Sequence, residues 1–387
     1  MGDKSNRLKY NRIIITTHVY ATGPAQDLKE YLLLRKVGNL LFIGHPLFYK
    51  ETLHGSGFEK YRSGKLKAKR YFKIRKIPPL VGYFQDAFLN VLFVLFTFRK
   101  WDLYVGSDNL NAFSGIILRK LGLVKRVIYY VIDYNPYRFK SGALNMVYHR
   151  IDQFCVKQAD ETWNLSPRME EGRKEYFNFE GGNQKVVPVA VWYDRYPRKS
   201  FDEIDHHKVV YMGHILKKQG IQHVISAIPE IVKEIPDFTF LIIGDGKYLP
   251  ELKKLARGLK VSSYIKFKGY VEDHREVEKL ISGCALGVAL YDKYDEFGNL
   301  SYTYFADPMK IKVYLAAGVP VMTTDVPYTS NLIQTHKLGL VIKDMSKIEG
   351  SLKTLLDDPN TVRLMRKNVL NYPEYINNFE IYDSLFL

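Results

Sequence analysis

The stretch from Tyr302 to Asp325 constrains the fold of this chain more than any other. Asp307 and Pro308 are typical of a helix start, since Asp is a favoured N-cap residue and Pro fits the first helical position. The apolar helix expected next ends at residues 316–318, where Gly318 can take the left-handed C-terminal cap. A short apolar strand over 320–322 follows. A helix leading directly into a buried strand predicts an open α/β sheet, in which ligands bind at the carboxyl ends of the strands.

Lys310 lies in the first turn of this expected helix. The free N–H groups and the dipole of a helix N-terminus attract phosphate, and a lysine there adds a cation. The sequence therefore indicates an anion site at Lys310. A solvated lysine on a capped core helix is the plainer interpretation of the same residues.

Strand-like apolar runs alternate with helical segments along most of the chain. The expected strands cover residues 13–15, 40–44, 103–106, 126–132, 161–165, 186–191, 209–214, 238–243, 265–270, 285–290, 320–322 and 339–342. An apolar helix is expected over 80–98. Such alternation predicts an α/β fold with parallel sheets covered on both faces.

Two domains are expected because 387 residues exceed what one hydrophobic core supports. The polar segment 194–207 is the expected linker between an N-terminal domain over 1–193 and a C-terminal domain over 208–370. Residues 371–387 then form a C-terminal tail, which could pack back on the N-terminal domain. Two apolar-context cysteines and no visible signal peptide favour a reducing, cytoplasmic setting.

The positive charge is confined to one half of the chain. Residues 1–192 hold 31 Lys+Arg against 16 Asp+Glu, giving +15, whereas residues 193–387 hold 26 against 25, giving +1. A basic run between Lys60 and Lys76 contains no acid and leads into the apolar segment 77–98.

Gln85, Asp86 and Asn90 near the middle of that apolar segment argue against its crossing a membrane. We therefore expect residues 60–98 to lie on an anionic membrane surface, where basic side chains and aromatic groups both contribute to binding. A solvated charged face and a core helix are the alternative interpretation. Nucleic acid is the competing anion, but the sequence contains no recognisable nucleic-acid module.

Two stretches of the C-terminal half carry a family resemblance. Residues 307–310 (Asp-Pro-Met-Lys) with 314–321 (Tyr-Leu-Ala-Ala-Gly-Val-Pro-Val) resemble the donor-site segment of retaining GT-B-fold glycosyltransferases of the family 4 type. Residues 241–246 (Leu-Ile-Ile-Gly-Asp-Gly) and 265–271 are similar to the nucleotide-binding core of that family. The resemblance covers the C-terminal half and, more weakly, the N-terminal half. It implies a GT-B fold: two Rossmann-like domains facing each other across a cleft, with the donor in the C-terminal domain.

The resemblance also implies a donor site. Its expected members are Gly213, His214, Lys218, Gly244, Gly246, Val271 and Lys310, with Asp307 bonding sugar hydroxyls. The family usually holds the diphosphate with two cations at the positions of His214 and Gln219, and a histidine is fully charged only below about pH 6.5. Val313 stands where the family commonly has a ribose-binding Glu, so the first acid of the usual pair would be Asp307 or Glu296.

Polar residues at the ends of several N-terminal strands are candidates for the acceptor side. Asp133 matches a position where the family often has a His or Asp facing the sugar, and a turn-capping Asp is the alternative. His18, Asp108 and Ser166 stand at equivalent strand ends, and His45 follows the second strand. The expected catalytic residues are thus Asp133, Asp307, Lys310 and His18.

The function implied is transfer of a hexose-type sugar from a nucleotide-diphosphate donor to a hydroxyl of a lipid-linked or saccharide acceptor. The resemblance implies retention of configuration, no metal ion and no cofactor besides the nucleotide-sugar donor. The enzyme would associate peripherally with the inner face of the cell membrane and would not bind nucleic acid. Two alternatives are a nucleotide-sugar epimerase of the same fold and a non-catalytic partner subunit.

Overall fold

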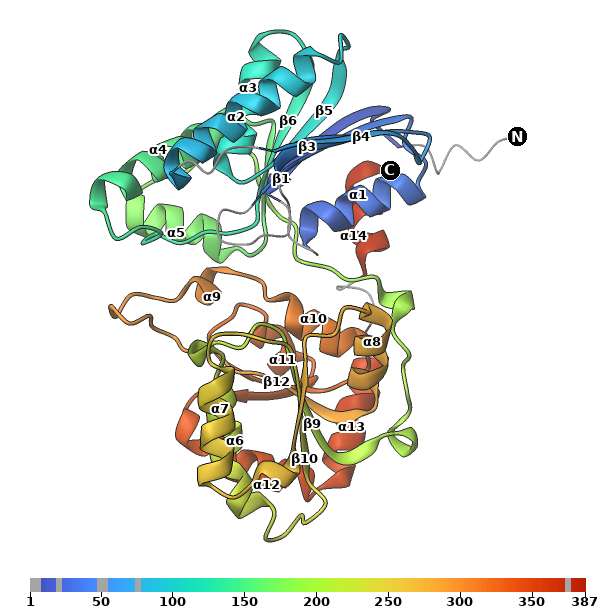
Figure 1. Cartoon of the computed structure of the whole chain (residues 1–387), viewed down its shortest axis with the longest axis vertical. Coiled ribbons are helices and arrows are strands. Elements are labelled where there is room, and N and C mark those ends of the chain that lie inside the picture. Colours follow the sequence, from blue (N-terminus) through green and yellow to red (C-terminus); the bar gives the residue numbers. More distant parts are fainter. Residues whose placement is uncertain (1–7, 19–22, 47–54, 74–77, 373–376) are drawn as a thin grey trace. The chain divides into compact units, whose positions relative to one another are not determined.

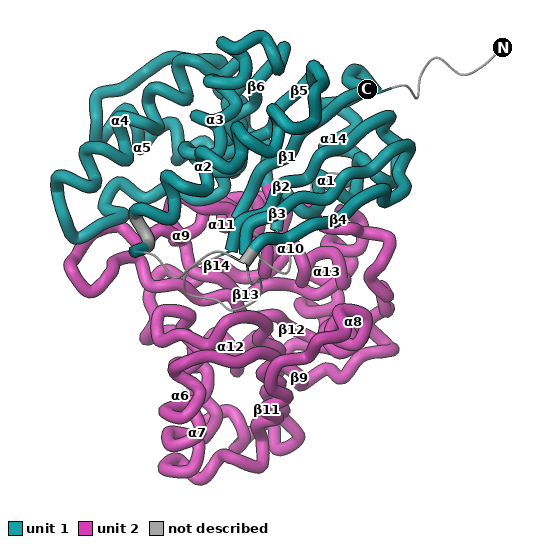
Figure 2. Tube along the Cα trace, turned by 45° about the horizontal axis from the view of Figure 1, so that its top comes forward, with its two compact units in different colours: residues 1–188, 378–387 teal, residues 189–377 magenta. Residues whose placement is uncertain are grey.

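The structure is a computed structural model that describes residues 8–18, 23–46, 55–73, 78–372 and 377–387. The chain divides into two compact units: unit 1 comprises residues 1–188 and 378–387, and unit 2 comprises residues 189–377 (Figure 2). Each unit contains one sheet flanked by helices (Figure 1). The α/β class with two Rossmann-like units, predicted from the sequence, is confirmed.

The sheet of unit 1 has the strand order β4-β3-β2-β1-β5-β6-β7-β8. Its strands are β1 (Arg12–His18), β2 (Asn39–His45), β3 (Gly55–Arg62), β4 (Lys65–Lys73), β5 (Trp101–Ser107), β6 (Val124–Val131), β7 (Glu161–Asn164) and β8 (Gln184–Val186). All pairs from β2 to β8 in this order are parallel. Ile13, Ile14 and Ile15 of β1 are completely buried, as a strand covered on both faces requires.

The hairpin formed by β3 and β4 departs from the expected parallel sheet. β3 pairs antiparallel with both β2 and β4, and the expectation of an all-parallel sheet is therefore wrong at this edge. In the first part of β4, the lysines at 65, 67 and 69 alternate with Leu66 and Ala68, a period of two that is typical of a strand. β4 is the edge strand, and lysines on an edge strand discourage pairing with another chain. The strand expected over 186–191 is likewise corrected to β8, which ends at Val186.

Helices cover both faces of the unit 1 sheet. They are α1 (Pro24–Leu34), α2 (Pro79–Leu95), α3 (Asn109–Lys120), α4 (Gly142–Gln158), α5 (Arg168–Phe177) and α14 (Asn378–Phe386). α2, α3 and α4 lie on one face, and α1 packs with α14 on the other (Figure 1). Tyr382 of α14 donates a hydrogen bond to the carbonyl of Pro24 at 3.1 Å, and Tyr31 of α1 donates to Asp383 at 2.7 Å. The end of the chain thereby belongs to unit 1.

α2 places its polar side chains inward and part of its apolar surface outward. Asp86 and Asn90 are buried, whereas Val81, Phe84 and Phe88 are more than half exposed. Among the described residues, none of the helices has both the length and the apolar character needed to cross a bilayer.

The sheet of unit 2 is parallel throughout, in the order β11-β10-β9-β12-β13-β14. Its strands are β9 (Asp205–Met212), β10 (Thr239–Ile243), β11 (Ile265–Gly269), β12 (Cys284–Ala289), β13 (Val321–Thr324) and β14 (Gly339–Ile342). Its helices are α6 (Ile221–Ile231), α7 (Leu249–Gly258), α8 (His274–Ser282), α9 (Tyr302–Phe305), α10 (Met309–Ala316), α11 (Ser330–Thr335), α12 (Ile348–Leu356) and α13 (Pro359–Leu370), and short 3-10 turns include η4 (Lys217–Gln219). Val209 and Val210 belong to two different apolar clusters, one on each face of the sheet.

Candidate functional site

The strand order places one candidate site in each unit. In an open parallel sheet, ligands bind beyond the carboxyl ends of the strands at the point where the strand order reverses. In unit 2 this point lies between β9 and β12, and in unit 1 it lies between β1 and β5. β9 leads into Gly213 and His214, β1 ends at His18, and β5 leads into Asp108.

Lys310, the second residue of α10, lies at the reversal point of unit 2. Its amine donates a hydrogen bond to Oε1 of Gln219 at 2.8 Å and lies 3.9 Å from the centre of the Tyr211 ring. A second ring, that of Tyr291, is 5.6 Å away. Burial lowers the pKa of Lys310 to about 7. The amine therefore lies at the end of β9 and is only partly protonated near neutral pH, so a bound anion would favour its protonated form.

Gly213 lies close to that amine. A Cβ at this position would lie 3.2 Å from Cε of Lys310, and its φ of +130° is one that other residues rarely adopt. The glycine therefore lets the turn after β9 and the side chain of Lys310 approach one another at the switch point.

Gly244 and Gly246 have a structural role in the turn after β10. A Cβ on Gly244 would lie 2.0 Å from the carbonyl oxygen of Gly213, and one on Gly246 would lie 2.2 Å from that of Ile215. The N–H of Ile215 donates to the carbonyl of Asp245 at 2.9 Å. These glycines allow the backbones of the loops after β9 and β10 to lie in direct contact, and this contact fixes the position of Gly213.

The two positions where the family has cations are filled differently here. His214 is exposed, and its carbonyl accepts a hydrogen bond from the Tyr211 hydroxyl at 2.8 Å. Gln219 is buried and directs its amide oxygen to Lys310. Lys218 is exposed, with its amine 4.2 Å from the centre of the Tyr302 ring. The amide of Gln219 thus positions the amine of Lys310 instead of supplying a second positive charge.

Asp307 does not cap α10, which corrects the sequence-based expectation. The N-cap position is Pro308, and no side chain accepts from the first turn of the helix. Instead, the buried carboxylate of Asp307 accepts hydrogen bonds from the N–H of Val189 at 2.9 Å and from the Thr329 hydroxyl at 2.6 Å. Its Oδ2 lies 3.5 Å from Nζ of the buried Lys312. Both oxygens are therefore engaged within unit 2.

Val271 and Val313, the two remaining valines of the expected donor region, both pack in the same apolar cluster. Val271 is half-buried after β11, and Val313 is 7% exposed in an apolar cluster. A side chain at 313 in this setting packs into the core, which explains why an apolar residue is accepted there.

A buried pair at the reversal point of unit 1 joins His18 and Asp108. Nδ1 of His18 lies 2.9 Å from Oδ2 of Asp108, and Nε2 lies 3.4 Å from Oδ2 of Asp86 on α2. His18 is only 7% exposed. One imidazole thus links the end of β1, the start of α3 and the inner face of α2.

The Asp86 carboxylate extends this pair into a buried polar network. Its other oxygen lies 3.2 Å from Nδ1 of His45 and accepts a hydrogen bond from Ser56 at 2.9 Å. Nε2 of His45 lies 2.8 Å from the amide oxygen of Asn90. The amides of Asn90 and Asn111 then continue the network to α3.

The network determines the charge of His18. Burial alone would lower the pKa of His18, but the carboxylates of Asp108 and Asp86 outweigh it and raise that pKa to about 9. Burial likewise would raise the pKa of Asp86, but the hydrogen bonds from His18 and His45 lower it to about 2. At neutral pH an imidazolium therefore lies between two carboxylates.

Asp108 adopts a backbone conformation that is costly for any residue but glycine. Its φ of 71° and ψ of 168° fall in a region of backbone conformation that is occupied almost only by glycine. Asp108 is also the N-cap of α3, and its side chain accepts a hydrogen bond from the N–H of Asn111. Such conformations cost on the order of 1–3 kcal/mol and cluster at functional sites. The strain therefore marks Asp108 as a candidate functional residue.

Asp133 lies outside this network, past the end of β6. It is about half exposed, and its Oδ2 accepts from Nη1 of Arg138 at 2.9 Å. The structure thus brings His18 together with Asp108 and Asp86, but gives Asp133 a separate partner. Sequence reasoning named Asp86 and Asn90 only as polar interruptions of an apolar segment. Their spacing of four residues, which places them on one face of a helix, was the available signal.

Among the residues described by the structure, no group of three or more His, Cys, Asp or Glu side chains is arranged to hold a metal ion. In the unit 1 network, the nitrogens of His18 and His45 already face carboxylate, hydroxyl and amide groups.

Comparison with known proteins gives a consistent picture. Residues 206–358 match the sequence model of the family described as Glycosyl transferases group 1. An alpha-D-kanosaminyltransferase from Streptomyces kanamyceticus is 28% identical over 180 residues, which are 46% of this chain and 43% of that protein. A GDP-mannose-dependent monoacylated alpha-(1-6)-phosphatidylinositol monomannoside mannosyltransferase from Corynebacterium glutamicum is 30% identical over 249 residues, 62% of this chain and 56% of that protein. The matched part thus spans about half the length of each relative.

The fold as a whole has solved counterparts. The structure of HepE from Anabaena, determined in complex with UDP, aligns with a TM-score of 0.68 and 13% identity. The alignment covers 97% of this chain and 98% of that chain. At this level of identity the likeness concerns the fold.

Proposed function

We propose that this chain, in which residues 206–358 are a glycosyl transferases group 1 domain within a GT-B fold, is a glycosyltransferase. It would transfer a sugar from a nucleotide-diphosphate sugar, bound by unit 2, to a hydroxyl of an acceptor bound by unit 1. UDP in the HepE complex and GDP-mannose in the name of the Corynebacterium relative support a nucleotide donor without choosing between the bases.

The position of Lys310 is the observation that carries the proposal. Its amine lies beside Gly213 at the switch point of a fully parallel sheet, in the first turn of α10. A diphosphate there would meet a cation, a glycine backbone and the N-terminus of a helix, a combination that suits a doubly negative ligand.

The chemical difficulty in sugar transfer is the charge that develops on the departing diphosphate. A preorganised cation and N–H groups stabilise such charge better than water does. We assign this task to Lys310, oriented by Gln219, with Lys218 and His214 at the exposed side of the site. Retention of configuration and independence of a metal ion remain parts of the proposal. So does front-face attack, in which the leaving phosphate takes the proton of the acceptor.

The acceptor hydroxyl is assigned to Asp108 in unit 1. Nδ1 of His18 lies 2.9 Å from Asp108 Oδ2, and the Asp108 carboxylate can accept a hydrogen bond from a hydroxyl. The Corynebacterium relative is named for a phosphatidylinositol mannoside acceptor, which supports a lipid-linked or saccharide acceptor here. Peripheral association with the inner face of the membrane, through residues 60–98, belongs to the same proposal. The part of that segment at 74–77 lies outside the described residues.

A panel of nucleotide sugars tests the proposal. Thermal shift identifies the donor that binds, and release of nucleotide is then followed with and without candidate acceptors. Lys310→Met should weaken donor binding roughly 10- to 150-fold, while Lys254→Met, at an exposed position on α7, should leave it unchanged. Nucleotide release with sugar transfer supports the proposal. Conversion of the sugar without transfer would instead indicate an epimerase, and absence of donor binding would indicate a non-catalytic partner subunit.

A further inference from the structure

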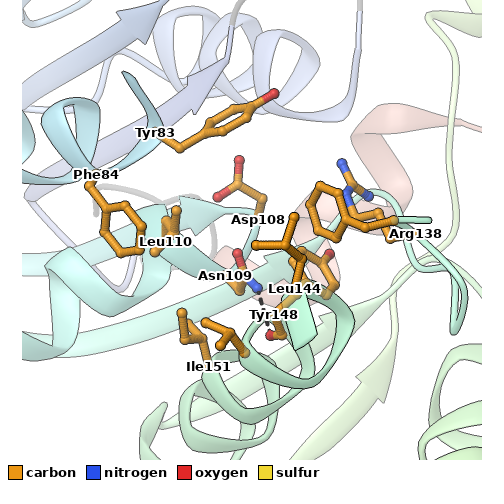
Figure 3. Close-up of a pocket in the computed structure, with 11 residues that line it drawn as sticks. Tyr83, Phe84, Asp108, Asn109, Leu110, Arg138, Leu144, Tyr148 and Ile151 are labelled. Atoms are coloured by element: carbon orange, nitrogen blue, oxygen red, sulfur yellow. Dashed lines mark hydrogen bonds between the residues drawn. The ribbon is translucent and has the colours of Figure 1, made fainter. Parts of the chain in front are cut away.

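A small apolar pocket lies in unit 1 beside the His18–Asp108 pair. It has a volume of about 140 Å³ and is enclosed by α2, the start of α3 and α4 (Figure 3). Most of its lining is apolar and includes Phe84, Leu110, Phe139, Leu144, Val147 and Ile151. All of its lining residues belong to unit 1, and Arg138 and Phe139 come from the loop that precedes α4.

The charged groups of the pocket are Asp108 and Arg138, and its other polar lining residues are Tyr83, Asn109 and Tyr148. Figure 3 shows the Asp108 carboxylate lying between Tyr83 and Arg138, both of which line the pocket. Asp108 binds His18, and the ring of Tyr83 lies 5.2 Å from that of His18 in an edge-on contact. Two walls of the pocket therefore touch the imidazole on which the proposed acceptor site is built.

Exposed apolar side chains lie at the mouth of the pocket on α2 and α4, and one more follows on α2. Phe84 on α2 lines the pocket and is 55% exposed, and Phe88 one turn further is 62% exposed. On α4, Val147 lines the pocket and is 50% exposed. Contiguous exposed apolar side chains of this kind mark binding surfaces for apolar ligands.

We propose that this pocket binds the first carbons of an alkyl chain carried by the acceptor, next to the hydroxyl that faces Asp108. The inference rests on the proposed function and specifies the acceptor as amphipathic. A sugar ring would bring a hydroxyl on almost every carbon, and those hydroxyls would lose their hydrogen bonds against the apolar walls. An alkyl chain needs polar partners only at its head, where Asp108 and Arg138 lie.

The volume sets the length of chain that the pocket can hold. A cavity of about 150 Å³ accommodates a benzene molecule, so a pocket of this size takes roughly six carbons. Each buried methylene should tighten binding roughly fourfold. Beyond about six carbons the chain would reach the exposed surface at Phe88, and the gain per methylene should fall.

The test is a titration of the full chain with soluble alkyl glucosides from methyl to octyl, each below its micellar concentration and without vesicles. Ligand-observed NMR gives the Kd. We expect the Kd to fall steeply up to about six carbons and then to level off. Val147→Trp, which places a large ring at the half-exposed rim, should abolish the dependence on chain length. Leu121→Trp is the matched control, because Leu121 is exposed on the same unit and does not line the pocket.

Two outcomes would overturn the inference. One is a Kd that does not change with chain length, and the other is a chain-length dependence that Val147→Trp leaves intact. Phe88→Ala separates the pocket from the general apolar surface, since only binding outside the pocket should depend strongly on Phe88. Donor binding is measured separately by thermal shift. Its failure would contradict the glycosyltransferase proposal and would leave the result on alkyl binding interpretable.

Discussion

The amine of Lys310 and the amide oxygen of Gln219 lie 2.8 Å apart, and this hydrogen bond orients the cation of the proposed donor site. The same amine lies over the ring of Tyr211 at 3.9 Å. Burial lowers the pKa of Lys310 from 10.5 to about 7, so that its charge is only partly present near neutral pH. A diphosphate would restore the charge, and donor binding is therefore coupled to protonation.

Donor affinity should depend on pH through Lys310. Below pH 7 the free amine already carries the proton, and the contribution of Lys310 to the affinity should be constant. Above pH 7 the free amine is neutral and must take up a proton on binding, so the affinity should fall by up to about tenfold per pH unit. Calorimetry of nucleotide-sugar binding in buffers of different ionisation enthalpy measures that proton uptake.

Lys310→Met is the control for this linkage. Methionine keeps an apolar stem beside Tyr211 but cannot be charged, so the proton uptake should vanish. The affinity at pH 6 should drop roughly 10- to 150-fold, the loss expected for one hydrogen bond to a charged group. A pH dependence that survives the substitution would place the titrating group elsewhere.

Asp108→Asn should leave donor affinity unchanged and slow transfer roughly 10- to 150-fold, the loss expected when one hydrogen bond to a charged group that positions the acceptor hydroxyl is weakened. Asparagine caps a helix as well as aspartate does, so the start of α3 should be preserved. The comparison is Asp133→Asn, since the sequence assigned the acceptor role to Asp133. Separate kcat and donor Kd measurements decide between them: a larger loss of kcat in Asp133→Asn would favour the sequence-based assignment.

Much of the fold was predictable because each local signal agreed with its neighbours. The glycine turn at 244–246, the helix start near Lys310 and the apolar strands between them fit a single parallel sheet, as observed. The strand-end position of His18 was also visible. In contrast, the bonds of Asp307 to Val189 and Thr329 join residues distant in sequence, and no local pattern specifies them.

The polar face of α2 shows the same limit in another form. In the sequence, Asp86 and Asn90 interrupt an apolar run, and the composition does not say which side of the helix is buried. A helix usually buries its apolar side chains and exposes its polar ones. In α2, Asp86 and Asn90 instead face inward, because they are the partners of His18 and His45. The burial of this polar network, rather than apolar patterning, accounts for the side of α2 that faces inward.

Asp307→Asn should act mainly on stability. The substitution removes the charge beside the buried Lys312, 3.5 Å away, while keeping a side chain of similar shape. An uncompensated buried charge costs on the order of 3–5 kcal/mol. Urea unfolding should therefore show a large loss in the free energy of unfolding. Near-normal stability with a selective loss of donor affinity would instead support the sugar-binding role that the sequence predicted.

The β3–β4 hairpin offers exposed cations to an anionic surface. Lys65, Lys67 and Arg70 are exposed, whereas Lys69 lies 3.1 Å from the carboxylate of Glu59. Protection of an edge strand is the competing explanation for these charges. Only the first explanation requires that the hairpin bind anionic lipid.

Changing Lys65, Lys67 and Arg70 to Glu should weaken binding to vesicles that contain anionic lipid. Each cation near such a surface contributes about 1 kcal/mol, so removing three should reduce the partition coefficient roughly a hundredfold or more. Co-sedimentation at low and high salt measures this, and binding of the unchanged protein should itself weaken as salt screens the charges. The matched control changes Lys254, Arg257 and Lys266, three exposed cations of unit 2, to Glu. If the hairpin variant binds like the unchanged protein, or if binding ignores the anionic lipid, the hairpin does not contact the membrane and its lysines act only to protect the edge of the sheet.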